Sequence, residues 1–296
     1  MLTDNDLPAL ARTLGIPGFV DIHTHFMPKQ VLDRVWAYFD RAGTGHRWPI
    51  QYRLDEHARV ETLRALGVVR FTSLNYAHRP DMAAWLNSWS ASFAAAHTDC
   101  AHSATFYPED GAGAYVEEAL TAGAAVFKVH LVVGNFDPWH ERLRPVWAQI
   151  EAAQVPVVIH AGEFPNPTRW TGAGRLRDVL VAHPELRLVI AHLGARDYLE
   201  LWDLGIRYPN VMWDTTMSFT DFFLQDRPVP NALVENVIEH PERIILGSDY
   251  PNIPHAYAHQ IEALQRLGVD ENWLRAVLYE NGARLLGHDQ SKGVAR

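Results

Sequence analysis

The sequence predicts an α/β fold, a (β/α)8 TIM barrel in which parallel strands alternate with helices. Short apolar, β-branched runs recur eight times between longer segments with helical periodicity. Several of these runs are apolar on both faces, as strands covered on both sides should be. No Gly-rich phosphate-binding loop follows the first run, which disfavours a doubly wound open sheet. We expect a single domain over residues 1–296, with the barrel core at about 18–286.

The predicted strands are short and bounded by turn residues or helical segments. They lie at 18–23, 67–74, 101–107, 124–131, 155–160, 187–192, 211–215 and 243–249. Among the segments between them, 55–67 is typical of a helix, with Asp55 as its N-cap and Gly67 at its end. Further helices are predicted at 81–97, 141–154, 173–183 and 231–240, and a closing helix at 271–287.

The longest segment without a predicted strand is 26–66, an insertion after the first strand. We expect it to fold over the barrel mouth. Its stretch "RAGTGHRWPIQYR" is polar, contains glycine and carries aromatic residues. These features indicate either a lid that contacts substrate or a solvated loop.

Charge and cysteine content narrow the function classes. The net charge of -9 disfavours a nucleic acid or an anionic membrane as the partner, because either would attract a basic surface. The N-terminus is acidic and no 18-residue apolar run follows it, so we expect a cytoplasmic protein. Cys100 is the only cysteine, which excludes an intramolecular disulfide and a Cys-based zinc site. Any bound metal must therefore be held by histidines and carboxylates.

The stretch "DIHTH" places His23 and His25 one residue apart at the end of the first strand. Alternate residues of a strand share a face, so the two rings lie roughly 7 Å apart, point the same way and can both reach one object. Metal binding and a hydrogen-bonded strand end both remain open for this pair alone. In a barrel, however, the carboxyl ends of all strands open on the face that holds the active site. Other strand ends there carry Lys128, His130, His160, His192 and Asp249.

The motifs "DIHTH", "VVIHAG", "VIAHLG" and "LGSDYPNIP" resemble those of the amidohydrolase superfamily. Within it, the chain is similar to the amidohydrolase-related branch, which includes aminocarboxymuconate-semialdehyde decarboxylase-like enzymes. The resemblance spans nearly the whole chain, from Gly18 to about Leu286. It implies one divalent metal, zinc in first place, held by His23, His25, His160 and Asp249. Imidazoles with a carboxylate suit zinc and equally manganese or iron.

The resemblance also implies roles for the strand-end residues. Asp249 is expected to act as base as well as ligand, although an Asp at a strand-to-helix turn can simply be an N-cap. His192 is expected to orient water or act as an electrophile rather than to ligate the metal. Alone, His160 would better fit a core histidine bonded to a carbonyl. Asp21 is expected either to support His23 or to make a hydrogen bond deep in the barrel.

By its order along the chain, Lys128 resembles the carboxylated lysine that bridges two metals in binuclear members of the superfamily. The amidohydrolase-related branch usually operates with one metal. The alternative for Lys128 is an ammonium that pairs with Asp249 or with a substrate carboxylate, since a buried unpaired lysine is costly.

Candidate substrate contacts lie in the segments that follow the strands, where barrel enzymes place specificity. They are Tyr76, His78, Tyr107, His130, Glu163, Arg169, Trp213 and His255. The expected reaction is hydrolysis of an amide, lactone or ester of a small molecule that can carry a carboxylate. The alternative is decarboxylation of an unsaturated or aromatic acid. A catalytically silent barrel is disfavoured because every ligand position is filled. The sequence does not indicate the oligomeric state.

Overall fold

The computed structural model describes residues 1–41, 48–224 and 228–287, and its strands are all parallel. The strands are β1 Phe19–Asp21, β2 Val68–Thr72, β3 Cys100–Ala101, β4 Ser103–Thr105, β5 Val126–His130, β6 Val157–His160, β7 Leu188–Ile190, β8 Val211–Asp214 and β9 Ile244–Ile245. They pair in the order β1-β2-β3 and β4-β5-β6-β7-β8-β9, which is their order along the chain.

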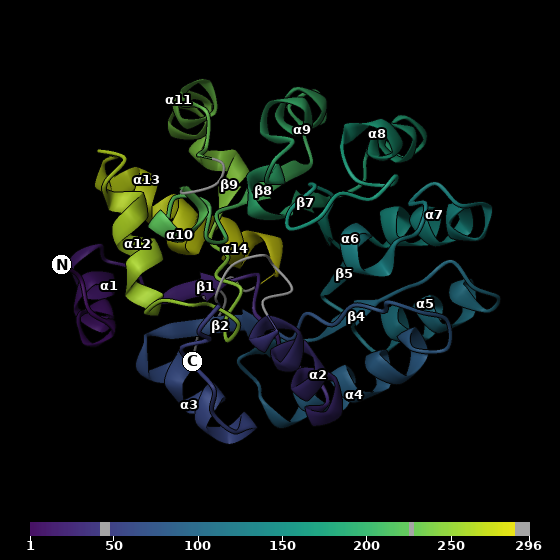
Figure 1. The fold of residues 1–296 in the computed structure, drawn as a ribbon, viewed down its shortest axis with the longest axis horizontal. Helices are drawn as coiled ribbons and strands as arrows, with labels where there is room; N and C mark the ends of the chain where they lie inside the picture. Colours follow the sequence, from purple (N-terminus) through teal and green to yellow (C-terminus); the bar gives the residue numbers. More distant parts are fainter. Residues whose placement is uncertain (42–47, 225–227, 288–296) are drawn as a thin grey trace, which may run out of the picture.

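The ends of this series meet, which closes the barrel. The Ile22 amide donates to the Leu246 carbonyl at 3.1 Å, and Thr24 forms a parallel bridge with Tyr250. Figure 1 shows the strands at the centre and the helices arranged around them. The predicted (β/α)8 barrel is therefore confirmed.

The helices follow the strands in alternation. They are α1 Leu7–Thr13, α2 Lys29–Asp40, α3 Glu56–Ala65, α4 Ala83–Ala96, α5 Ala112–Thr121, α6 Leu131–Gly134, α7 Arg144–Ala153, α8 Ala173–Ala182, α9 Tyr198–Gly205, α10 Asp221–Leu224, α11 Asn231–Glu239, α12 Tyr257–Gln265, α13 Glu271–Arg275 and α14 Asn281–Leu285. The predicted cap of α3 is confirmed, because the Asp55 carboxylate accepts a hydrogen bond from the Ala58 amide at 2.8 Å. Among the described residues, no helix is both long and apolar enough to cross a bilayer.

Two predicted elements are divided in the structure. The third strand, predicted at 101–107, is split into β3 and β4 at His102. There the Ser73 amide donates to the Ser103 hydroxyl at 3.0 Å, so a side chain takes the place of a ladder carbonyl. The closing helix, predicted at 271–287, contains the π-helical segment Ala276–Glu280 between α13 and α14.

The insertion after β1 contains α2 and α3, which lie between β1 and β2 in the sequence. The tip of the predicted lid, residues 42–47, lies outside the described residues. Side chains of α2 line the cavity described below.

Along the barrel strands, apolar side chains lie deep in the barrel, and titratable side chains follow two residues later, nearer the carboxyl ends of the strands. On β5, Val126 belongs to a buried apolar cluster and Lys128 follows two residues later. On β6, Val158 belongs to the same cluster and His160 follows it. Because alternate residues of a strand share a face, Lys128 and His160 point the same way as Val126 and Val158 and lie closer to the carboxyl ends of the strands, over the apolar cluster.

Candidate metal centre

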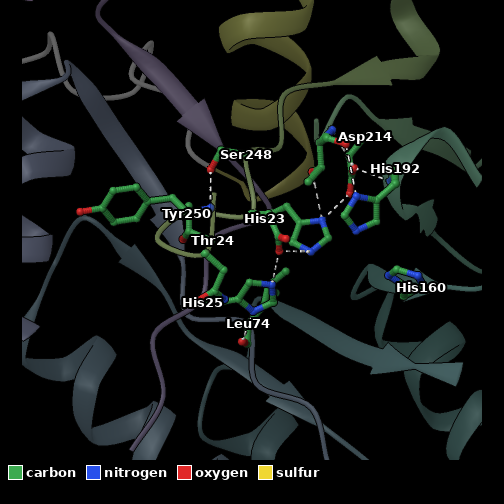
Figure 2. Close-up of polar contacts among 12 residues, drawn as sticks. His23, Thr24, His25, Leu74, His160, His192, Asp214, Ser248 and Tyr250 are labelled. Carbon is green, nitrogen blue, oxygen red and sulfur yellow. Dashed lines mark hydrogen bonds and ion pairs between the residues drawn. The ribbon is translucent and has the colours of Figure 1, made fainter. Parts of the chain in front are cut away.

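The three histidines predicted as ligands and His192, predicted to orient water, converge at the carboxyl ends of the strands. His23 and His25 follow β1, His160 ends β6, and His192 follows β7 (Figure 2). The ring centroid of His23 lies 5.1 Å from those of both His25 and His192, and that of His160 lies 4.8 Å from that of His192. All four rings are buried.

Asp249 completes this cluster from the segment after β9. Its Oδ1 lies 2.7 Å from His25 Nε2 and 3.7 Å from His23 Nε2. In the part of the chain that the structure describes, the candidate ligand atoms that all lie within 4.8 Å of one another belong to His23, His192 and Asp249. His25 adjoins this group through Asp249.

Close approach of β9 to the cluster depends on Gly247 in the motif "LGSDY". A Cβ at this position would lie 2.3 Å from the Thr216 hydroxyl and 2.7 Å from the Cβ of His23. Any other residue would push the end of β9, and with it Asp249, away from His23.

The hydrogen bonds of His23 and His25 fix which ring nitrogen carries the proton. His23 Nδ1–H donates to Asp214 Oδ2 and His25 Nδ1–H donates to the Leu74 carbonyl, both at 2.8 Å. In the neutral rings the Nε2 atoms then hold the lone pairs, and both are directed at the Asp249 carboxylate. Lone pairs and a carboxylate repel one another, so a cation has to lie between them: without metal, a proton on His25 Nε2, which lies 2.7 Å from Asp249 Oδ1, and with metal, the ion in place of that proton. This donor set therefore suits a divalent metal.

His160 and His192 are oriented by backbone carbonyls. His160 Nε2–H donates to the Phe164 carbonyl at 2.7 Å, and His192 Nδ1–H donates to the Thr216 carbonyl at 3.2 Å. The lone pairs of the neutral rings then lie on His160 Nδ1 and His192 Nε2. With this tautomer His192 can ligate a metal or accept a hydrogen bond from water, which agrees with its predicted water-orienting role. An oxyanion would need a protonated Nε2.

The electrostatics of the site favour neutral rings for His23 and His192 and an ionised carboxylate for Asp249. Burial, followed by the charge of Lys128, lowers the pKa of His23 to about 3, although Asp214 acts in the opposite direction. Burial also lowers the pKa of His192. It would raise the pKa of Asp249, but the hydrogen bond and charge of His25, followed by the charge of His23, hold that pKa below its usual range. Neutral imidazoles with an anionic carboxylate are the forms that bind a metal.

Lys128 lies fully buried beside the cluster, with its Nζ 3.2 Å from His23 Nε2. Burial lowers the pKa of Lys128 to about 8, while the charges of Asp214 and Asp249 act in the opposite direction. A cationic Lys128 thus has carboxylate partners within the site.

Comparison with protein families decides the identity of this barrel. A model of the amidohydrolase family matches residues 20–288. The chain belongs to the amidohydrolase family. This membership supports an enzyme and agrees with the divalent metal that the motifs imply. No curated protein matches the sequence of this amidohydrolase.

Solved structures share its fold at low sequence identity. An uncharacterised TIM-barrel protein from Bordetella bronchiseptica has a TM-score of 0.70 and 18% identity, covering 91% of this chain and 98% of its own. A Pseudomonas putida protein assigned as a 2-pyrone-4,6-dicarboxylic acid hydrolase has a TM-score of 0.62 and 17% identity, covering 92% and 98%. A 5-carboxyvanillate decarboxylase from Novosphingobium aromaticivorans, complexed with manganese and 4-hydroxy-3-methoxy-5-nitrobenzoic acid, has a TM-score of 0.64 and 15% identity, covering 92% and 97%. The neighbours thus include both reaction classes.

A cavity of about 800 Å³ opens onto the cluster. Of the predicted substrate contacts, Tyr76, His78 and His130 line it. The remaining predicted contacts are not among its lining residues; these are Tyr107, Glu163, Arg169, Trp213 and His255. Trp213 is fully buried, with its ring 4.3 Å from that of Trp202. It therefore packs in the core.

The sequence analysis missed two kinds of site residue. Asp214 at the end of β8 bonds the His23 ring, whereas Asp21 accepts from the backbone amide of His23 and from the Tyr257 hydroxyl. A carboxylate at a barrel strand end, in "VMWDT", was the available signal for Asp214. Arg34 and Arg79 line the cavity from α2 and from the segment after β2. Nothing in their sequence surroundings indicated this.

We expect one metal per chain and an uncarboxylated Lys128. The Lys128 Nζ contacts a ring nitrogen of His23, and the residues that the structure describes contain one group of converging ligand atoms. Elemental analysis of protein purified with and without added bicarbonate measures the stoichiometry. Two metals per chain, with occupancy rising on added bicarbonate, would contradict this prediction.

Proposed function

We propose that this amidohydrolase is a hydrolase that uses one divalent metal, zinc in first place, to cleave an amide, lactone or ester bond of a small molecule. One observation carries the proposal. Two imidazole lone pairs, from His23 and His25, meet the ionised carboxylate of Asp249 where the cavity reaches the strand ends.

The residues around the candidate metal site can each take a separate role in hydrolysis. A divalent metal in the site supplies a Lewis acid that polarises a carbonyl and acidifies water. Asp249 is placed to accept the proton of the attacking water and return it to the leaving group. His192 Nε2 accepts a hydrogen bond from that water, which orients it. The buried ammonium of Lys128 is placed to stabilise negative charge that develops on the carbonyl oxygen.

The cavity favours a substrate that carries a carboxylate on an apolar body. The guanidinium groups of Arg34 and Arg79 make no hydrogen bond or ion pair with the described parts of the chain, and both residues line the cavity. Burial and then the charges of Arg79 and Arg34 lower the pKa of His78, which places both guanidinium groups near one side chain. Asp81 also lines the cavity, as does Asp249. Apolar and aromatic lining is supplied by Val31, Val35, Tyr38, Phe39, Trp48, Met82, Trp85 and Phe164.

Replacing Arg79 with Gln is expected to raise KM for an acidic substrate, with kcat changing much less. A hydrogen bond to a charged group contributes about 1.5–3 kcal/mol, which corresponds to roughly 10- to 100-fold in KM. Arg34→Gln is expected to act in the same direction. Steady-state kinetics with the acid and its neutral methyl ester measure this, because only the acid should be affected. Arg169→Gln, outside the cavity lining, is the control, and an equal effect there would contradict the prediction.

Decarboxylation is the second candidate, and the same cavity supports it. Arginines beside aromatic walls suit an aromatic acid, and the neighbour complexed with manganese and a nitrobenzoic acid is a decarboxylase. In this alternative the carboxylate is lost as carbon dioxide.

Two measurements test the proposed function. Elemental analysis under metal-replete conditions comes first, and absence of a stoichiometric metal would overturn both candidates. A substrate panel follows, in which proton release from lactones, amides and esters is compared with carbon dioxide release from unsaturated and aromatic acids. Carbon dioxide release without hydrolysis would replace the hydrolase by the decarboxylase.

A further inference from the structure

We propose that Asp214 is a positioning residue that fixes the ring tautomer of His23 and so reserves Nε2 of that ring for the metal. This inference rests on the metal centre of the proposed function. It concerns a residue at the end of β8 that is not among the residues lining the cavity.

Asp214 is fully buried, and both of its carboxylate oxygens are engaged. Its Oδ2 accepts from His23 Nδ1–H at 2.8 Å. Its Oδ1 accepts from the backbone amides of His192 at 2.8 Å and Thr216 at 3.1 Å. The two backbone donors prevent the carboxylate from rotating, so Oδ2 stays directed at the His23 ring (Figure 2).

An ionised carboxylate can only accept hydrogen bonds, so it requires a proton on His23 Nδ1. The Thr216 hydroxyl also lies 3.2 Å from this nitrogen, but a hydroxyl donates or accepts equally well and does not select a tautomer. Asp214 is therefore the group that leaves the lone pair on Nε2, which lies 3.7 Å from Asp249 Oδ1.

The same carboxylate aligns a second candidate ligand. His192 has a left-handed backbone with φ of 55°, a conformation that is unfavourable for a residue with a Cβ. The hydrogen bond from its amide to Asp214 supports that conformation. One side chain on β8 thus sets the ring of His23 after β1 and the backbone of His192 after β7.

Asp214→Asn tests the tautomer directly. The amides of His192 and Thr216 both need an acceptor, so the Asn oxygen is expected to take the place of Oδ1. The Asn NH₂ group then faces His23 Nδ1, which must accept, and the proton moves to Nε2. We expect ¹⁵N NMR of the metal-free protein to show His23 as the Nε2–H tautomer, with its signals assigned by their loss in His23→Gln. Zn²⁺ affinity, measured by competition with a chelator, should fall ~10- to 100-fold.

Asp21→Asn is the matched control. It makes the same atomic change at another buried carboxylate, which contacts His23 only through its backbone amide at 3.1 Å. The His23 ring should keep its Nδ1–H tautomer there.

Three results would overturn the inference: an Nε2–H tautomer of His23 in the wild-type protein, a switched tautomer in a Thr216→Val variant, or unchanged Zn²⁺ affinity in a switched Asp214→Asn variant. The first two need no folded Asp214 variant. Because the spectra are recorded without metal or substrate, a failure of the proposed hydrolysis leaves their outcome unaffected.

Discussion

Replacing Asp249 with Asn is expected to lower kcat by ~10²- to 10⁴-fold, the usual contribution of general acid–base catalysis. The structure places Asp249 Oδ1 against His25 Nε2 and near His23 Nε2, and these neighbours hold the pKa of the carboxyl below its usual range. The carboxylate is therefore ionised and available as a base at neutral pH. Asn has the same size and keeps one oxygen for the metal, but it cannot accept the proton of an attacking water.

Metal content and kcat have to be compared in the same preparation of this variant. Much of the metal should be retained while turnover is lost. Asp81→Asn is a suitable control, because Asp81 lines the same cavity but lies outside the group of converging ligand atoms. Near-normal turnover in metal-loaded Asp249→Asn would remove Asp249 as the base and direct attention to His192.

The barrel could be predicted because burial on both faces gives parallel strands a clear sequence pattern. The breaks in the predicted elements could not. The third strand is divided because the Ser103 hydroxyl, instead of a backbone carbonyl, accepts the hydrogen bond from the Ser73 amide. The pattern of apolar residues does not indicate when a side chain replaces a backbone acceptor. The closing helix contains a π segment, after which Asn281 donates to the carbonyls of Pro241 and Ile244 at 2.7 Å each. That contact depends on a neighbour 40 residues away in the sequence.

The same distinction applies to the site. The clustering of the site residues could be predicted, because each lies at or just after the end of a strand and all strand ends share one face. These residues are His23, His25, His160, His192 and Asp249. The hydrogen-bond partner of the His23 ring could not be predicted, because Asp21 and Asp214 both lie at the ends of barrel strands and either could reach the ring. Only the three-dimensional structure shows that Asp21 bonds Tyr257 on α12 and that Asp214 bonds the ring. Arg34 could not be found either, because its place in the cavity depends on how α2 packs.

His160→Ala is expected to remove the metal, and this variant decides between two ligand sets. The motif resemblance includes His160 among the ligands, whereas the tightest group of ligand atoms in the described structure contains His192 instead. His160 Nε2–H donates to the Phe164 carbonyl at 2.7 Å, which fixes the orientation of the ring. Its Nδ1 then keeps the lone pair that can bind a metal. Loss of a ligand should weaken binding by at least the ~100-fold that loss of an outer partner can cause.

His130 offers the control for this variant, because its ring stacks on that of His160 with centroids 3.9 Å apart and an angle of 10°. His130→Ala removes the same ring area without removing a predicted ligand, so it should keep its metal. His192→Ala should keep metal and lose activity if His192 only orients water. Zn²⁺ affinity by chelator competition, with circular dichroism to show that each variant is folded, separates the cases. Full metal binding in His160→Ala together with loss of metal in His192→Ala would replace His160 by His192 in the ligand set. In that case the His160 ring only packs against His130, and its removal leaves the metal ligands unchanged.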